Sequence, residues 1–142
     1  MIFPDVNLLL YAHDESSVFH KTSAKWLKAA LSNEQVFFSW HTITGFLRII
    51  TNPRLSLNPL TIEQAVKIVE SWLEQDNTHL VNLDKKNWNL FAKVLIDGQA
   101  SGNLVMDAHL AALSESCGAT LASTDRDFTR FPDIRLTNPL KP

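Results

Sequence analysis

The chain has 142 residues, of which 45% are hydrophobic and 20% are charged, as is ordinary for a soluble globular protein. This length is enough for one sizeable core, so we expect a single domain over residues 1–142. The formal net charge of −2 excludes a global basic field, so binding of a nucleic acid would need a local basic patch or a bridging metal ion.

Taken in chain order, apolar segments typical of strands alternate with segments of helical periodicity. The expected strands are Met1–Phe3, Val36–Trp40, His79–Leu83 and Ala119–Ser123, with a candidate fifth at Ile134–Thr137. The expected helices fill the gaps between them, at Leu8–Ala12, Lys21–Leu31, Thr42–Thr51, 61–75, Lys86–Ile96 and Leu104–Cys117. This alternation predicts an α/β fold of three layers, in which helices cover both faces of a central parallel sheet of four to five strands.

Local signals mark the ends of two of these elements. Thr61 and Gln64 have the spacing of a capping box, which predicts the start of the helix over 61–75. The segment "DGQASGN", residues 97–103, is rich in turn-forming residues and is the most flexible-looking loop of the chain.

The single Cys117 and the N-terminal segment indicate a compartment. One cysteine excludes an internal disulfide and suits a reducing environment, and we expect a buried, inert thiol. The N-terminus lacks a basic stretch, and its longest apolar run is far too short to span a membrane. We therefore expect a cytoplasmic protein with no membrane segment.

Three aspartates stand where ligands of parallel sheets usually bind, beyond the carboxyl ends of the strands. Asp5 follows the first expected strand, and Asp125 follows the fourth, with Asp127 two residues later. Asp107 lies in the first turns of an apolar helix that begins near residue 103. If the sheet is parallel, Asp5, Asp107 and Asp125 could meet at one edge, with the amide of Asn7 beside them.

Carboxylates that converge repel each other and resist ionisation unless a cation compensates them. Mg²⁺ and Mn²⁺ prefer carboxylate oxygens and pair with phosphate, and such an ion can activate water and stabilise charge on a phosphodiester. In this interpretation Asp5 is a metal ligand, and Asn7 holds its carboxylate or a bound water in place.

A simpler explanation competes for each acid except one. Asp5 and Asp125, each taken alone, are better explained as helix N-caps, and Asp127 as a first-turn acid favoured by the helix dipole. Capping does not explain Asp107, because it lies past the first residues of its helix.

Four segments, "PDVNLLLYA", "GFLRIITNPR", "NLVMDAHLAAL" and "ASTDRDFTRF", resemble in order and spacing the PIN-domain ribonucleases, specifically the VapC-type toxins of bacterial toxin–antitoxin modules. The resemblance implies the PIN-like α/β/α fold and cleavage of RNA, such as tRNA or rRNA, with Mg²⁺ or Mn²⁺ as cofactor. It implies that Asp5, Asp107 and Asp125 hold the metal, that Asp127 is an outer member, and that Asn7 and Thr124 are polar neighbours. It also implies a homodimer and a VapB-type antitoxin partner.

One position departs from the family pattern. Most members carry a glutamate in the helix after the second strand, where this chain has Gly45, as in a subgroup that shares the "TNPR" segment. Arg48 lies one helical turn further on and could partly replace the lost polarity. Loss of one carboxylate leaves open a second function, a catalytically silent PIN fold that only binds RNA or a protein partner. A phosphatase with an aspartate nucleophile is a weaker third interpretation, because Asn7 cannot supply its second acid.

Other chemically active residues have simpler roles in this interpretation. The five histidines lack paired metal-ligand spacing, and we predict structural or surface roles for them. Four tryptophans, Trp26, Trp40, Trp72 and Trp88, are expected to pack in the core, although Trp40 could instead stack on a base because it ends a strand near the site. The arginines expected near the acidic edge are Arg48, Arg54, Arg126 and Arg130.

Overall fold

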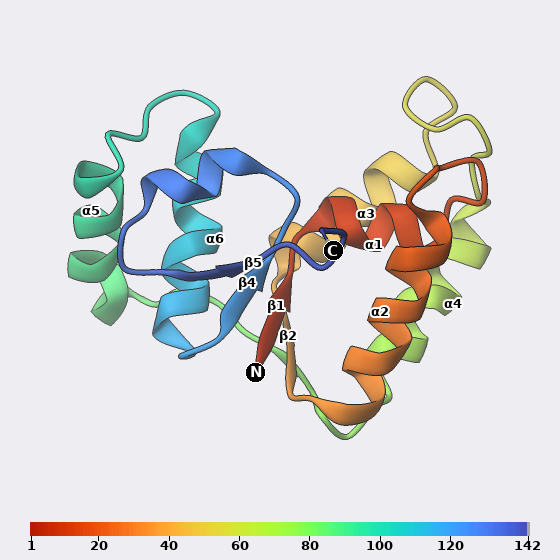
Figure 1. The fold of residues 1–142 in the computed structure, drawn as a ribbon, viewed down its shortest axis with the longest axis horizontal. Coiled ribbons are helices and arrows are strands. Elements are labelled where there is room, and N and C mark those ends of the chain that lie inside the picture. Colours follow the sequence, from red (N-terminus) through yellow and green to blue (C-terminus); the bar gives the residue numbers. More distant parts are fainter. Residues whose placement is uncertain (142) are drawn as a thin grey trace.

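Five parallel strands form a single sheet in the order β3-β2-β1-β4-β5. The computed structural model of the chain describes residues 1–141 (Figure 1). The strands are β1 Ile2–Pro4, β2 Val36–Phe38, β3 Thr78–Leu80, β4 Thr120–Ala122 and β5 Arg135–Thr137. Each matches an expected strand, including the candidate fifth, so the prediction of a parallel sheet is confirmed.

Six α-helices and two short 3₁₀ helices connect the strands. The α-helices are α1 Val6–Ala12, α2 His20–Asn33, α3 Trp40–Ile50, α4 Ile62–Leu73, α5 Trp88–Asp97 and α6 Leu104–Ser116. The 3₁₀ helices are η1 Lys85–Asn87 and η2 Arg126–Arg130. The capping box predicted at the start of α4 is present, since Thr61 Oγ1 accepts from the Gln64 N–H and Gln64 Oε1 accepts from the Thr61 N–H.

Helices cover both faces of the sheet, as the alternation of strands and helices predicted (Figure 1). One apolar core lies between the sheet and α1 to α4, and it includes Val36 and Phe38 from β2. The other lies under α5 and α6 and includes Phe3 from β1 and Leu121 from β4. Because successive strand residues point to opposite faces, β2 contributes Phe37 to this second core.

The expectation that all four tryptophans pack in the core is wrong for two of them. Trp72 is 2% exposed and stacks on Phe38 with 5.2 Å between ring centroids, and Trp26 is half-buried against the same core. Trp40 and Trp88 are 53% and 59% exposed. Each is the first residue of its helix, and the buried residues of the two helices lie further along, from Thr42 onward in α3 and at Val94 in α5.

Trp40 also does not end a strand. The β2 strand stops at Phe38, and Ser39 caps α3 by accepting a hydrogen bond from the Thr42 N–H at 3.1 Å. A cap requires an extended backbone at Ser39, after which the chain turns into the helix.

The structure corrects one expectation about Cys117. Cys117 is half-buried rather than buried, and its partial burial raises the pKa of its thiol, which disfavours the reactive thiolate. Within residues 1–141, no helix is both long and apolar enough to cross a membrane.

Candidate metal centre

The sheet brings Asp5 and Asp125 to the same edge because β1 and β4 are neighbours. Pro4 pairs with Ala122 at the carboxyl ends of these strands, and the Asp5 N–H donates to the Ala122 carbonyl oxygen at 2.9 Å. Both strands end there, so the residues that follow them leave the sheet side by side.

Ser123 connects the two aspartates. Its hydroxyl donates to Asp5 Oδ2 at 2.8 Å and accepts from the Asp125 N–H at 3.0 Å. Asp5 Oδ1 accepts from the Val6 N–H at 2.8 Å, so both oxygens of this buried carboxylate have a donor. Sequence reasoning assigned Ser123 no role, although a serine that ends an otherwise apolar expected strand, two residues before Asp125, was the signal that could have identified it.

The capping interpretation is confirmed for two of the acids. Asp5 is the N-cap of α1, and Asp125 is the N-cap of η2, where its Oδ1 accepts from the Asp127 N–H at 2.8 Å. Capping uses one face of each carboxylate, so it does not prevent the remaining lone pairs from facing a ligand.

The carboxylates of Asp107, Asp125 and Asp127 form a cluster in which one oxygen from each lies within 4.8 Å of the others. Asp107 enters it from the first turn of α6. Asp127, expected as an outer member, therefore has an oxygen within 4.8 Å of both Asp107 and Asp125. Asp5 is outside this cluster but lines the same cavity as Asp107 and Asp125.

That cavity has a volume of about 190 Å³, and we call it the acidic cavity. Its wall also contains Asn7 from α1 and Gly45 and Arg48 from α3, so these three predicted site residues are brought to the acids. His41, predicted as a structural or surface histidine, is exposed and lines the same cavity.

Thr124 is not in the wall of the acidic cavity. It lines a neighbouring hollow together with Arg126, and Asp125 lines both this hollow and the acidic cavity. The reason is local, because Ser123 rather than Thr124 turns its hydroxyl toward Asp5. Arg54 lies exposed in the turn after α3 and does not line the cavity.

The loop before α6, which fixes the position of Asp107, is anchored rather than loose. Arg130 Nη1 donates to the Gly98 carbonyl oxygen at 3.0 Å. A Cβ at Gly98 would lie 2.4 Å from the ring of Phe131, so this close approach requires glycine. These contacts tie the loop to η2, which carries Asp127.

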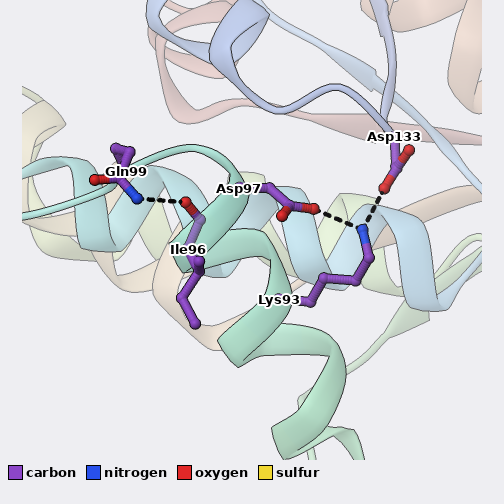
Figure 2. Close-up of polar contacts among 5 residues, drawn as sticks. All are labelled: Lys93, Ile96, Asp97, Gln99 and Asp133. Carbon is purple, nitrogen blue, oxygen red and sulfur yellow. Dashed lines mark hydrogen bonds and ion pairs between the residues drawn. The ribbon is translucent and has the colours of Figure 1, made fainter.

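An ion-pair cluster holds the other side of the same loop (Figure 2). Lys93 Nζ donates to Asp97 Oδ2 at 2.6 Å and to Asp133 Oδ2 at 2.8 Å, which joins the end of α5 to the segment before β5. Gln99, at a φ of 47°, donates through Nε2 to the Ile96 carbonyl oxygen. The turn-forming composition that made the loop look flexible thus serves a fixed tight turn.

The pKa values of Asp107 and Asp5 are raised, which shows that ionising both carboxyl groups is unfavourable when no cation is bound. The pKa of Asp107 is raised to about 6, first by burial and then by the charges of Asp125, Asp5 and Asp127, and only Arg130 opposes the shift. Burial raises the pKa of Asp5, against the hydrogen bonds from Ser123 and Val6. Crowded carboxylate oxygens with poor compensation are the donor set that Mg²⁺ or Mn²⁺ prefers, so the residues present fit a divalent ion.

Gly45 leaves room in the cavity wall. A Cβ built there would meet only Val6 Cγ2, at 3.5 Å, which is an ordinary contact. Packing therefore does not require glycine at this position, and a longer side chain would extend into the acidic cavity.

The chain matches a known protein family and several known proteins over most of its length. Residues 2–134 match the family model described as the PIN domain. Ribonuclease VapC37 of Mycobacterium tuberculosis is 39% identical over 136 residues, which cover 95% of this chain and 94% of that protein. Ribonuclease VapC33 of the same species is 32% identical over 142 residues and 99% of both chains.

Solved structures share the fold. The toxin–antitoxin complex VapBC2 of Rickettsia felis, solved with promoter DNA, contains a chain that superposes with a TM-score of 0.70 at 17% identity, over 97% of this chain and 98% of that one. VapC20 of Mycobacterium tuberculosis, described as a sarcin–ricin loop cleaving toxin, superposes with a TM-score of 0.63 at 16% identity, over 95% and 99% of the two chains.

Proposed function

The chain belongs to the PIN-domain family and, within it, to the VapC ribonucleases, and we propose that it is a metal-dependent endoribonuclease toxin that hydrolyses RNA phosphodiester bonds. The observation that carries the proposal is the convergence of four aspartates on one edge of the sheet, three of them with oxygens within 4.8 Å of one another. Relatives of 32% and 39% identity that are named ribonucleases support the reaction class.

We assign the metal to Asp5, Asp107 and Asp125, with Asp127 as a fourth carboxylate within reach of the same ion. When bound, Mg²⁺ or Mn²⁺ supplies a Lewis acid that activates water and stabilises charge on the phosphate. Ser123 holds the Asp5 carboxylate and the Asp125 backbone in a fixed relation, so the ligand set is preorganised before the ion arrives.

The remaining residues of the acidic cavity would position the substrate. Arg48 is exposed and lines the same cavity as the acids, where its guanidinium can pair with a phosphate of the RNA. Asn7 offers an amide to the same space. Thr124 lines the neighbouring hollow, so we assign it no part in holding the ion. We propose instead that its side chain contacts the bound RNA next to Asp125.

Partners follow from the relatives. Structural neighbours are toxin–antitoxin complexes, and we infer that a VapB-type antitoxin silences this chain. We also expect a homodimer that acts in the cytoplasm on RNA such as tRNA or rRNA. Because the net charge of the chain is −2, the protein as a whole does not attract RNA. The attraction must come from local cationic side chains and from the metal ion.

Gly45 favours a second candidate function, a silent PIN fold that binds RNA or protein without cleaving. The cavity wall has a space where another side chain would fit, so the site has one carboxylate fewer than it could hold. A silent module would need no divalent ion, and this distinguishes the two functions.

The experiment that tests the proposal is cleavage of total tRNA and rRNA by the purified chain, free of antitoxin, with Mg²⁺, with Mn²⁺ and with EDTA. We expect discrete fragments that require the metal and are lost in Asp5→Asn and Asp107→Asn variants. Arg54→Ala, outside the cavity, is the matched control and should cleave normally. Absence of cleavage by folded wild-type protein in both metals would refute the ribonuclease function and favour the silent module.

A further inference from the structure

Four aromatic rings form a continuous row that starts in the wall of the acidic cavity. The ring of His41 lies 6.3 Å from that of His109, which lies 5.8 Å from Phe91, which in turn lies 6.1 Å from Trp88, and each of these pairs meets edge to face. The row therefore runs from the start of α3 across α6 to the start of α5. We call these four side chains, His41, His109, Phe91 and Trp88, the aromatic row.

The row is accessible to a ligand. Its two end members, His41 and Trp88, are exposed, and its two middle members are half-buried. Trp88 is 59% exposed, although a tryptophan offers more apolar area for burial than almost any other side chain. Core packing thus accounts for little of the Trp88 surface.

The far end of the row opens into a hollow that suits a planar ring. The hollow has a volume of about 280 Å³, and its walls include the rings of Trp88 and Phe91 and the apolar side chain of Leu83. Lys85, which is exposed, lines the hollow and offers a cation, and Asp84, which also lines it, is paired with Lys86 at 3.7 Å. An aromatic wall with an ammonium group beside it matches the two parts of a nucleotide, its base and its phosphate.

We propose that the aromatic row is a binding track for single-stranded RNA, in which one base stacks on the exposed first ring, His41, and a later base occupies the hollow beside Trp88. The choice of RNA rests on the proposed ribonuclease function. The path itself rests on the position of the row, because its first ring lines the cavity in which the phosphodiester would be cleaved. Unpaired bases stack on aromatic side chains with little regard to sequence, so the track would select single strands rather than a particular base.

The track predicts that affinity depends on the length of the RNA. A dinucleotide bound at the acidic cavity is too short to reach Trp88, which lies three ring-to-ring steps of 6.3, 5.8 and 6.1 Å from that cavity, whereas an unpaired RNA of ten nucleotides can reach it. Removal of the Trp88 ring should therefore weaken binding of the longer RNA and leave the dinucleotide unaffected.

The test measures binding of a fluorescein-labelled, unpaired RNA decamer to the full chain by anisotropy in EDTA, where no cleavage occurs. Trp88→Ala should raise Kd by roughly 5- to 150-fold, the loss expected for one stacked base. Trp88→Phe keeps an aromatic face and should bind nearly as wild type. Ile96→Ala, which removes a 66% exposed side chain from the other end of α5, is the matched control and should change nothing.

Failure of the track and failure of the ribonuclease function give different results. Equal decamer affinity of Trp88→Ala and wild type would overturn the track even if both cleave RNA. Loss of self-association or of antitoxin binding in Trp88→Ala, with RNA affinity intact, would overturn it too and assign the ring to a protein interface. Decamer binding that needs Trp88 in a protein that cleaves nothing would support the track and refute only the ribonuclease.

Discussion

Replacement of Asp107 by asparagine should make the metal-free protein more stable at neutral pH, although it removes a candidate metal ligand. The carboxyl of Asp107 has its pKa raised from 3.8 to about 6 in the folded chain, chiefly by burial and by the neighbouring carboxylates. The folded state therefore binds the proton more tightly than the unfolded state does. Stability is lost as pH rises from about 4 to about 6, and the loss is complete at neutral pH.

The magnitude follows from the size of the shift. A rise from 3.8 to about 6 corresponds to about 3 kcal/mol at 1.36 kcal/mol per pKa unit. Asp107 is partly open to solvent, which screens these charges, so we expect about 1–2 kcal/mol in practice. Asparagine has nearly the same shape and carries no charge, so it should remove this penalty.

Urea denaturation in EDTA at pH 7.5 and pH 4 measures the effect. At pH 7.5 the Asp107→Asn variant should be the more stable protein, and at pH 4 most of its advantage should be absent. Asp76→Asn, an exposed aspartate after α4, is the control and should stay within about 0.5 kcal/mol of wild type at both pH values.

Mg²⁺ should reverse the order of stability. An ion that binds only the folded state stabilises wild type by about 2.7 kcal/mol at 100 times its Kd, and the variant should gain less because it lacks one ligand. A variant that is no more stable than wild type at pH 7.5 without metal would refute the idea that the acids repel each other. An advantage of equal size at both pH values would refute it as well, because the cause would then not be charge.

Three further predictions concern the support of the site. Ser123→Ala should lower the free energy of unfolding, measured by urea denaturation, by about 1–3 kcal/mol, because the Asp5 carboxylate loses a buried hydrogen-bond donor. It should also weaken Mg²⁺ binding in calorimetry. Ser123→Thr keeps the hydroxyl and should preserve both the stability and the Mg²⁺ affinity. The Gly45→Glu variant should fold, because a side chain has room at this position, and it should bind Mg²⁺ at least about tenfold more tightly than wild type, because it adds a carboxylate. If Gly45→Gln binds Mg²⁺ as tightly as Gly45→Glu, the added charge is not the cause. Arg130→Ala should speed hydrogen exchange in the loop at Gly98 without unfolding the sheet, and unchanged exchange would show that the loop does not depend on this anchor.

Much of the fold could be predicted from the sequence because its signals are local. Strand and helix periodicity, the capping box at Thr61 and the polar breaks between segments specify the elements, and alternation of the two types specifies a parallel sheet with helices on both faces. Local signals failed at Trp88, whose helical spacing suggested burial, and at Trp40, which was expected to end a strand and to pack in the core. Each tryptophan is the first residue of its helix, and only the tertiary structure shows that this end of the helix is exposed.

The sequence by itself determined which residues could bind a metal, and the tertiary structure decided which of them meet. Placement of Asp5 and Asp125 after strands follows from chain order, but their proximity requires that β1 and β4 be neighbours in the sheet. The approach of Asp107 depends on a loop held by Arg130, 31 to 32 residues away along the chain. The bond between Ser123 and Asp5 spans 118 residues, and no pattern in the sequence specifies a contact at that separation. Such contacts form only after the sheet order has brought distant strand ends together, because hydrogen bonds between side chains act over about 3 Å.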